Sequence, residues 1–251
     1  MPKIMICIVV RMKSTRLPQK AMLDIYGKPL IQRLLDRLSS EFDKQEICIC
    51  TSDNPDDKIL IDLAVENNLS YVAGDELDVM KRLITVASIH KAEVLVRVTG
   101  DNPLTDPTII RDMIEDHCRH GADYTFFDQI PRGSRSEVIS SKCLQRIYEQ
   151  LSDTKSSEYM TYMLKRPDKL KVNQFIPGNY ELIEPNLSFT VDTPEDLSFI
   201  KDIYKHFNSS LMNLNEVISF CRNHPNYNNR LFDSPKSFPK ISGIDYSFKD
   251  D

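Results

Sequence analysis

The sequence IMICIVVRMKSTRLPQK, residues 4–20, decides the fold class of this chain. It begins with an apolar run, residues 4–10, which is typical of a buried strand covered on both faces. An irregular segment with four cations and two hydroxyls follows: Arg11, Lys13, Ser14, Thr15, Arg16 and Lys20. A loop that leaves the carboxyl end of a parallel strand opens at the ligand-binding edge of the sheet, so these side chains are placed to hold phosphate oxygens. The competing interpretation is a solvated basic turn, because the glycines of the Walker and dinucleotide-binding loops are missing.

The same order of strand and helix repeats along the first half of the chain. Apolar runs at residues 46–51 and 93–98 alternate with helical periodicity at 29–39, 56–68 and 77–90. Pro29, Pro55 and Pro107 stand where first helical turns would begin. Repeated strand and helix predicts a doubly wound α/β core with a mostly parallel sheet.

The second half of the chain is less regular. We expect a strand near residues 137–139, helices at 142–151 and 156–166, and a returning strand at 187–191 that leads into a helix beginning at Pro194. The prediction is one domain over residues 1–230, with a core half at 1–121, an irregular α+β insertion at 122–187 for substrate specificity or dimer contacts, and a returning strand with C-terminal helices at 188–230. Residues 231–251 are expected to form a surface tail.

Composition excludes several classes of protein. A net charge of −5 over 251 residues argues against a nucleic-acid surface and makes the basic loop a local feature, suited to a small anionic ligand. The sequence contains neither a membrane-spanning apolar stretch nor a signal-peptide pattern, so we expect a cytoplasmic protein without a membrane partner. The six cysteines are expected to be reduced core thiols, because Cys48 and Cys50 have no second pair with which to bind a metal.

Two aspartates are predicted at the same edge of the sheet as the basic loop. Asp101 follows the apolar strand 94–98, and Asp192 follows the predicted strand 187–191. Two carboxylates together with phosphate oxygens and water suit Mg²⁺. The alternatives are structural: Asp101 as a turn residue before Asn102, and residues 192–196 as an ordinary helix N-terminus in which Asp192 or Thr193 caps the first turn.

Five blocks in order carry a resemblance to a known family. They are RMKSTRLPQK (11–20), GKPLI (27–31), DVMKR (78–82), RVTGDNPL (97–104) and TVDTPEDL (190–197). Together they resemble the cytidylyltransferases of the SpsF-like and CMP-Kdo synthetase group, which are also similar to acylneuraminate cytidylyltransferases. The resemblance implies a Rossmann-like nucleotidyltransferase that uses CTP and Mg²⁺ to form a CMP-activated sugar or sugar acid, for surface polysaccharide or glycoconjugate biosynthesis, and releases pyrophosphate.

The resemblance also implies roles for particular residues. The nucleotide would be bound in the half 1–121 by Arg11, Met12, Ser14, Thr15, Arg16, Lys20, Asp78, Arg82, Thr99 and Asp101. Among these, Arg16, Lys20 and Asp101 would act with Asp192 in catalysis, and the two aspartates would bind the metal. The acceptor would lie in the segment 122–187, near Glu137, Tyr159 and Thr161, and the same segment would form a homodimer. For Asp78 and Arg82, an ion pair on a helix surface is the alternative.

The chain departs from the family pattern at Lys13 and Gln19, where glycine is usual. Two other functions stay open at this stage. A glycosyltransferase would use a similar fold, although it usually carries an Asp-x-Asp pair that is missing around Asp101. A non-catalytic nucleotide-binding module would need only the fold.

Overall fold

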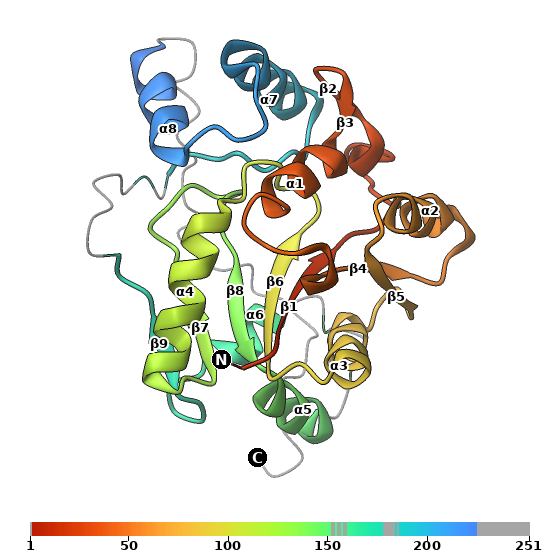
Figure 1. Cartoon of the computed structure of the whole chain (residues 1–251), viewed down its shortest axis with the longest axis vertical. Coiled ribbons are helices and arrows are strands. Elements are labelled where there is room, and N and C mark those ends of the chain that lie inside the picture. Colours follow the sequence, from red (N-terminus) through yellow and green to blue (C-terminus); the bar gives the residue numbers. More distant parts are fainter. Residues whose placement is uncertain are drawn as a thin grey trace.

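A computed structural model describes residues 2–151, 154, 157, 160–177, 184 and 186–224 (Figure 1). Its main sheet has seven strands in the order β5-β4-β1-β6-β8-β7-β9. Their bounds are β1 (Ile4–Val9), β4 (Ile47–Ser52), β5 (Ser70–Gly74), β6 (Val94–Thr99), β7 (Tyr124–Phe126), β8 (Glu137–Ser140) and β9 (Val172–Gln174). Strand β8 is antiparallel to both of its neighbours, and the other pairings are parallel. The predicted α/β class with a mostly parallel sheet is confirmed.

The helices alternate with the strands as the periodicity predicts. They are α1 (Leu30–Leu38), α2 (Lys58–Glu66), α3 (Val79–His90), α4 (Pro107–His120), α5 (Ser141–Gln150), α6 (Met160–Leu164), α7 (Pro194–Phe207) and α8 (Leu214–Asn223). Short 3-10 turns cover Lys20–Met22, Lys44–Glu46 and Pro55–Asp57, and a small hairpin pairs β2 (Asp24–Ile25) with β3 (Lys28–Pro29). Pro107 and Pro194 occupy first-turn positions of α4 and α7, where the missing N–H costs nothing.

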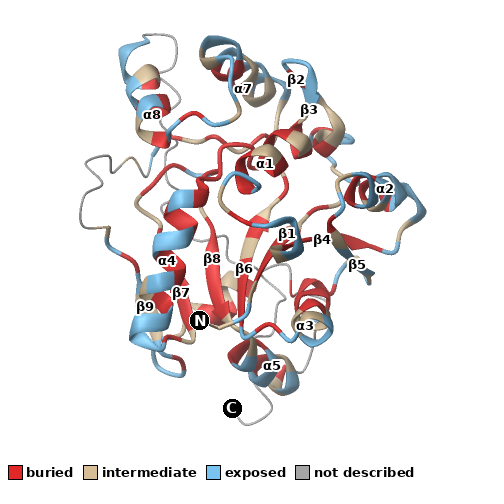
Figure 2. Cartoon of the chain, viewed as in Figure 1, coloured by how far each residue is buried: buried red, intermediate tan, exposed pale blue. Residues whose placement is uncertain are grey.

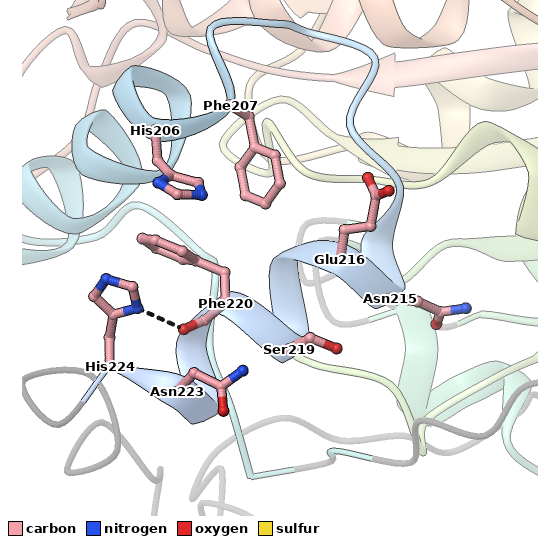
Figure 3. Close-up of a pocket in the computed structure, with 8 residues that line it drawn as sticks. All are labelled: His206, Phe207, Asn215, Glu216, Ser219, Phe220, Asn223 and His224. Carbon is pink, nitrogen blue, oxygen red and sulfur yellow. Dashed lines mark hydrogen bonds between the residues drawn. The ribbon is translucent and has the colours of Figure 1, made fainter.

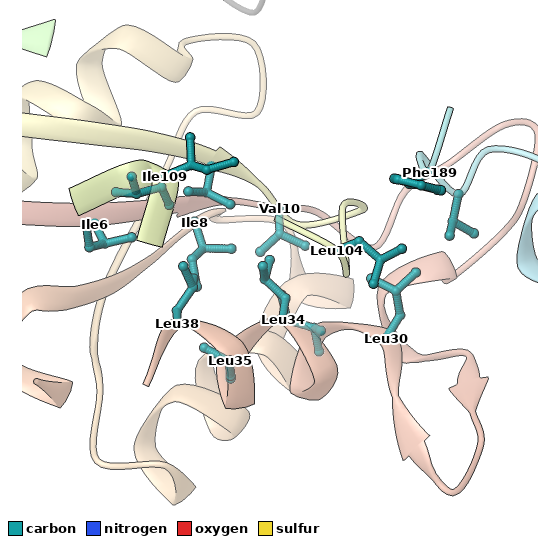
Figure 4. Close-up of a cluster of buried hydrophobic side chains, with 14 of the residues drawn as sticks. Ile6, Ile8, Val10, Leu30, Leu34, Leu35, Leu38, Leu104, Ile109 and Phe189 are labelled. Carbon is teal, nitrogen blue, oxygen red and sulfur yellow. The ribbon is translucent and has the colours of Figure 1, made fainter. Parts of the chain in front are cut away.

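Helices cover both faces of the sheet, and each face has its own core. Along β1, Ile6 and Ile8 belong to one cluster, whereas Met5 and Cys7 belong to the other, because successive side chains of a strand point to opposite faces. The larger cluster includes side chains from α1, α2, α4, α7 and α8, and part of it is drawn in Figure 4. The smaller cluster includes side chains from α3, α5 and α6. Figure 2 shows the central strands β1, β6 and β8 largely buried between these layers.

The strand predicted at residues 187–191 is wrong. Among the described residues the segment forms no strand, and an isolated parallel bridge joins Arg132 to Ser188. The segment does not join the sheet because its N–H groups bond to loop carbonyls: Phe189 donates to Arg132 at 2.7 Å, and Val191 donates to Asp101 at 3.2 Å. The segment is therefore extended and held by turns, and it still delivers Asp192 to the edge of the sheet.

Other predictions can be compared with the described residues. All six cysteines are free, and each except Cys118 is buried. Among the helices of the described ranges, none has both the length and the apolar character needed to cross a membrane. The predicted tail at 231–251 lies outside the described residues.

Candidate active site

The basic loop is anchored to the neighbouring strand by a buried carboxylate. Asp57 is 1% exposed, and its Oδ1 accepts the backbone N–H of Met12 at 2.7 Å. Its Oδ2 accepts bonds from the Thr51 hydroxyl at 2.9 Å and from the Ser52 N–H and hydroxyl groups. The Met12 side chain lies in the core, so this residue, expected at the nucleotide, instead fixes the start of the loop.

Replacing Asp57 with asparagine should loosen this loop. The substitution turns one carboxylate oxygen into an NH₂ group, and in either orientation of the amide this group faces an N–H donor. We therefore expect a loss of about 1–3 kcal/mol in the free energy of unfolding, together with weaker nucleotide binding. Urea unfolding and nucleotide titration measure the two effects. Asp56→Asn is the matched control, because Asp56 is exposed and precedes the buried carboxylate by one position. Equal stability of the two variants would contradict the anchoring role.

The backbone at Gln19, where the family usually has glycine, keeps a conformation typical of glycine. Its φ is 54°, in the left-handed region that favours glycine, so the backbone there keeps a conformation that suits the usual glycine although a side chain is present. The next residues, Lys20–Met22, form a 3-10 turn in which the Met22 N–H donates to the Gln19 carbonyl at 2.9 Å. This turn directs Lys20 toward the sheet edge.

A cavity of about 570 Å³ opens beside the loop. Its lining includes predicted nucleotide-binding residues, namely Arg11, Ser14, Thr15, Arg16, Lys20, Arg82, Thr99 and Asp101, together with Lys13. Glu76 faces the loop across this cavity and pairs with Arg11 at 3.0 Å and Lys13 at 3.4 Å. The Nε of Arg82 is buried and has no hydrogen-bond partner among the described atoms.

Asp78 lies outside the lining of this cavity. Its carboxylate caps α3 by accepting the Lys81 N–H at 2.9 Å, and it also accepts hydroxyl bonds from Tyr148 at 2.7 Å and Ser157 at 3.2 Å. These bonds fasten α3 to α5 and to the segment before α6. The structure therefore gives Asp78 a local structural role.

The two predicted metal-binding aspartates lie together beside Lys20. The Lys20 Nζ donates to Asp101 Oδ2 at 2.6 Å and to Asp192 Oδ1 at 2.9 Å, and Arg16 also pairs with Asp192 at 3.0 Å. The backbone bond from Val191 to the Asp101 carbonyl holds the two segments side by side. The helix cap is Thr193, which forms a capping box with Asp196, so the alternative of Asp192 as the cap is wrong and its carboxylate faces the site.

These carboxylates have the right chemistry for a divalent cation. Burial by itself would lower the pKa of Lys20, but the Asp101 and Asp192 carboxylates hold it above its ordinary value, so the ammonium form persists. No group of three or more His, Cys, Asp or Glu side chains suited to a metal occurs in the part of the chain that the structure describes. Two hard oxygen donors fit Mg²⁺ if phosphate oxygens and water complete its shell. Asp101 and Asp192 would then be the protein's ligands.

A second cavity of about 450 Å³ shares Arg16, Lys20, Arg97, Thr99 and Asp101 with the first. The predicted acceptor residues Glu137 and Thr161 both line it, and Tyr159 lies outside the described residues. Burial would raise the pKa of Glu137, but the Arg97 guanidinium and hydrogen bonds from Tyr124 and Thr161 hold it below its usual value. Glu137 is therefore an anion fixed by three donors.

The sequence interpretation missed several residues of the second cavity. Arg97 lines both cavities and pairs with Glu137, and its signal was a lone cation inside the apolar strand 94–98. Arg135 and its neighbours had no such signal, because they come from the irregular loop after β7. Other lining residues that the sequence did not indicate include Tyr124, Phe126, Phe127, Asp128, Arg132 and Lys165.

Another pocket, of about 490 Å³, lies between α7 and α8 (Figure 3). Its described lining is aromatic and polar without lysine or arginine: His206, Phe207, Asn215, Glu216, Ser219, Phe220, Asn223 and His224. The rings of His206 and His224 lie 4.2 Å and 4.1 Å from that of Phe220. A triphosphate requires cations, so the paired cavities are the candidate active site.

The fold and the paired cavities define an α/β protein with a cationic loop beside two carboxylates at the edge of its sheet. The sequence profile of the family described as "Cytidylyltransferase" matches residues 5–230. This chain belongs to the cytidylyltransferase family, and it is a cytidylyltransferase enzyme. The interpretation as a cytidylyltransferase is confirmed over a glycosyltransferase or a non-catalytic module.

Named relatives agree with this assignment. The spore coat polysaccharide biosynthesis protein SpsF of Bacillus subtilis is 32% identical over 210 residues, which cover 82% of this chain and 88% of that protein. A 3-deoxy-manno-octulosonate cytidylyltransferase of Geobacter sulfurreducens is 34% identical over 110 residues, 43% of this chain and 42% of that protein. A solved cytidylyltransferase from Leptospira borgpetersenii has a TM-score of 0.83 at 21% identity, covers 95% of this chain and 100% of its own, and supports the fold.

Proposed function

We propose that this enzyme transfers the cytidylyl group of CTP to a hydroxyl group of an acidic sugar, with Mg²⁺ held by Asp101 and Asp192, and releases pyrophosphate. The observation that carries the proposal is the junction of the two cavities at Lys20 and Asp101. A nucleotide in the first cavity and an acceptor in the second would meet at the cation and carboxylates. The product would be an activated sugar for polysaccharide or glycoconjugate synthesis, in keeping with the name of the SpsF relative.

In this reaction the acceptor hydroxyl oxygen forms a bond to the α-phosphorus of CTP and loses its proton to water, while the bond to pyrophosphate breaks. Arg11, Arg16 and Lys20 line the nucleotide cavity and would offset the charge on the triphosphate and on departing pyrophosphate. When bound, Mg²⁺ supplies further positive charge at the phosphate oxygens. Since the protein forms no covalent bond to the substrates in this reaction, positioning and electrostatics account for catalysis.

The charge of the second cavity favours an acidic acceptor. Its basic side chains outnumber its acidic ones: Arg16, Lys20, Arg97, Arg132, Arg135 and Lys165 against Asp101, Asp128, Glu137 and Asp192. Arg132 and Arg135 both line this cavity. The pKa of Arg135 is lowered, chiefly by burial and, although Asp128 opposes the shift, further by the charge of Arg132. An anion there would relieve their repulsion, as a sugar carboxylate would. The relative that acts on 3-deoxy-manno-octulosonate, which is an acid, agrees with this class.

The test is pyrophosphate release from each of the four nucleoside triphosphates with Mg²⁺ and a set of acceptors. The set begins with 3-deoxy-manno-octulosonate and includes other keto-deoxy sugar acids, with neutral hexoses in parallel. We expect release with CTP and a sugar acid and its loss with EDTA. Release with GTP or UTP alone would overturn the choice of nucleotide, and release with neutral hexoses alone would overturn the acidic acceptor.

Arg135→Met tests the acceptor cavity separately. Because the change removes a half-buried cation that lines the second cavity and not the first, we expect the KM for the acidic acceptor to rise at least about 10-fold while the KM for CTP changes little. Arg146→Met is the matched control, since it removes an exposed arginine of α5 that pairs with Asp123 at 3.5 Å. A rise in both KM values, or none in either, would contradict the assignment of the second cavity.

The homodimer and the cytoplasmic location stay predictions. The edge strand β9 belongs to the segment expected to form the dimer, and Ile176 beside it is 77% exposed.

A further inference from the structure

The ammonium of Lys20 stands between the two carboxylates assigned to the metal. It is 2.6 Å from Asp101 Oδ2 and 2.9 Å from Asp192 Oδ1, and the Lys20 side chain is only 15% exposed. Each carboxylate comes from a different segment, and the ammonium bonds to both. Lys20 is therefore an internal counterion that bridges the pair.

A divalent cation bridging the same carboxylates would need this space. Mg²⁺ binds carboxylate oxygens at about 2.0–2.1 Å, closer than an ammonium approaches them. An ammonium and a metal ion held by the same two oxygens would also repel each other strongly in a partly buried site. Lys20 and a metal ion would therefore compete for these two oxygens, Asp101 Oδ2 and Asp192 Oδ1.

We propose that Lys20 occupies the metal position in the nucleotide-free enzyme and leaves it only when phosphate oxygens offer an alternative, so that metal and nucleotide bind cooperatively. The inference rests on the proposed function for the identity of the nucleotide. Lys20 lines the nucleotide cavity as well as bridging the carboxylates, so a triphosphate there gives its ammonium new acceptors. Arg16 also pairs with Asp192, but it is 67% exposed and reorients at little cost.

This arrangement has a functional consequence. The free enzyme binds divalent cations weakly, and the metal enters with, or after, the triphosphate that it must contact. The coupling is reciprocal, because a ligand that tightens the binding of another is itself tightened by the same factor. Lys20 then occupies the metal position in one state and binds phosphate oxygens in the other.

The experiment measures Mn²⁺ binding to nucleotide-free protein, from the electron paramagnetic resonance signal of the free ion. We expect Lys20→Met and Lys20→Gln to bind Mn²⁺ at least about 10-fold tighter than the unaltered protein, because removing the ammonium frees both carboxylates. Lys20→Arg retains the charge and should bind as weakly as the unaltered protein. Adding Asp101→Asn to Lys20→Met should abolish the gain, which identifies the carboxylate pair as the site.

Lys28→Met is the matched control. It also removes a lysine that pairs with an aspartate, Asp36 at 2.7 Å, and it changes the net charge equally. The inference is overturned if neither neutral Lys20 variant binds Mn²⁺ more tightly, or if Lys28→Met gains as much. A CTP titration of the same proteins tests the proposed nucleotide, which absence of CTP binding would refute. The Mn²⁺ titration without nucleotide would still decide the role of Lys20.

Discussion

Asp101→Asn is expected to lower turnover by about 100-fold or more, because the charge at the transferring phosphate is stabilised electrostatically and the substitution removes one of two carboxylates. The same change takes from Lys20 its shorter ion pair, at 2.6 Å. Steady-state pyrophosphate release with CTP, Mg²⁺ and the acidic acceptor measures the effect. The loss should appear in kcat, since the nucleotide cavity keeps its cations.

Asp53→Asn is the matched control for this result. Asp53 follows β4 at the same edge of the sheet, and its side chain is exposed. We expect this variant to turn over at nearly the rate of the unaltered enzyme. If Asp101→Asn kept more than about a tenth of the turnover, the metal role assigned to Asp101 would be refuted.

Gly133→Ala is expected to have the largest effect on stability. Gly133 has a φ of 82°, and a Cβ there would lie 2.2 Å from the Thr190 nitrogen and 2.4 Å from the Phe189 carbonyl carbon. The neighbours are backbone atoms, so the segment that carries Asp192 must move. Backbone strain and overpacking together should lower the free energy of unfolding by about 3 kcal/mol or more, measured by urea unfolding.

Gly121→Ala separates the effect of backbone strain from the effect of overpacking. Gly121 ends α4 with a φ of 56°, and nothing lies within 4 Å of a Cβ built there. Its substitution should cost only about 1 kcal/mol, the cost of the left-handed conformation for a residue with a side chain. Equal losses in the two glycine variants would show that the contact with the Asp192 segment is unimportant.

The regular part of the fold followed from local pattern. Strand β1 and helix α1 bury apolar side chains at the periods that their sequences display, and Pro107 and Pro194 mark real helix starts. The segment at 187–191 shows where the pattern fails: its alternating apolar residues are buried, yet its partners are the loop carbonyls of Arg132 and Asp101. Burial explains alternation, but it does not determine hydrogen-bonding partners.

The site residues that follow an apolar run of the sequence could be predicted. Lys20, Asp101 and Asp192 lie together as expected. Asp57 was missed because its role depends on a contact with Met12, 45 positions earlier. Arg135 was missed because the loop after β7 has no periodicity from which its direction could be inferred. Asp78 was placed at the nucleotide through the resemblance, and its capping of α3 became evident only in three dimensions.

The close packing of Gly133 against residues 189–190 also has a consequence for the order in which the enzyme folds during synthesis. Among the described residues the last strand of the sheet ends at Gln174, and Asp192 leaves the ribosome after it. A nascent chain can therefore complete its sheet while one of the two carboxylates is still missing. It gains the second carboxylate only when the late segment packs beside Gly133, and its larger core is complete only when α7 and α8, which follow Asp192, have also been made, so the site and the core are completed together.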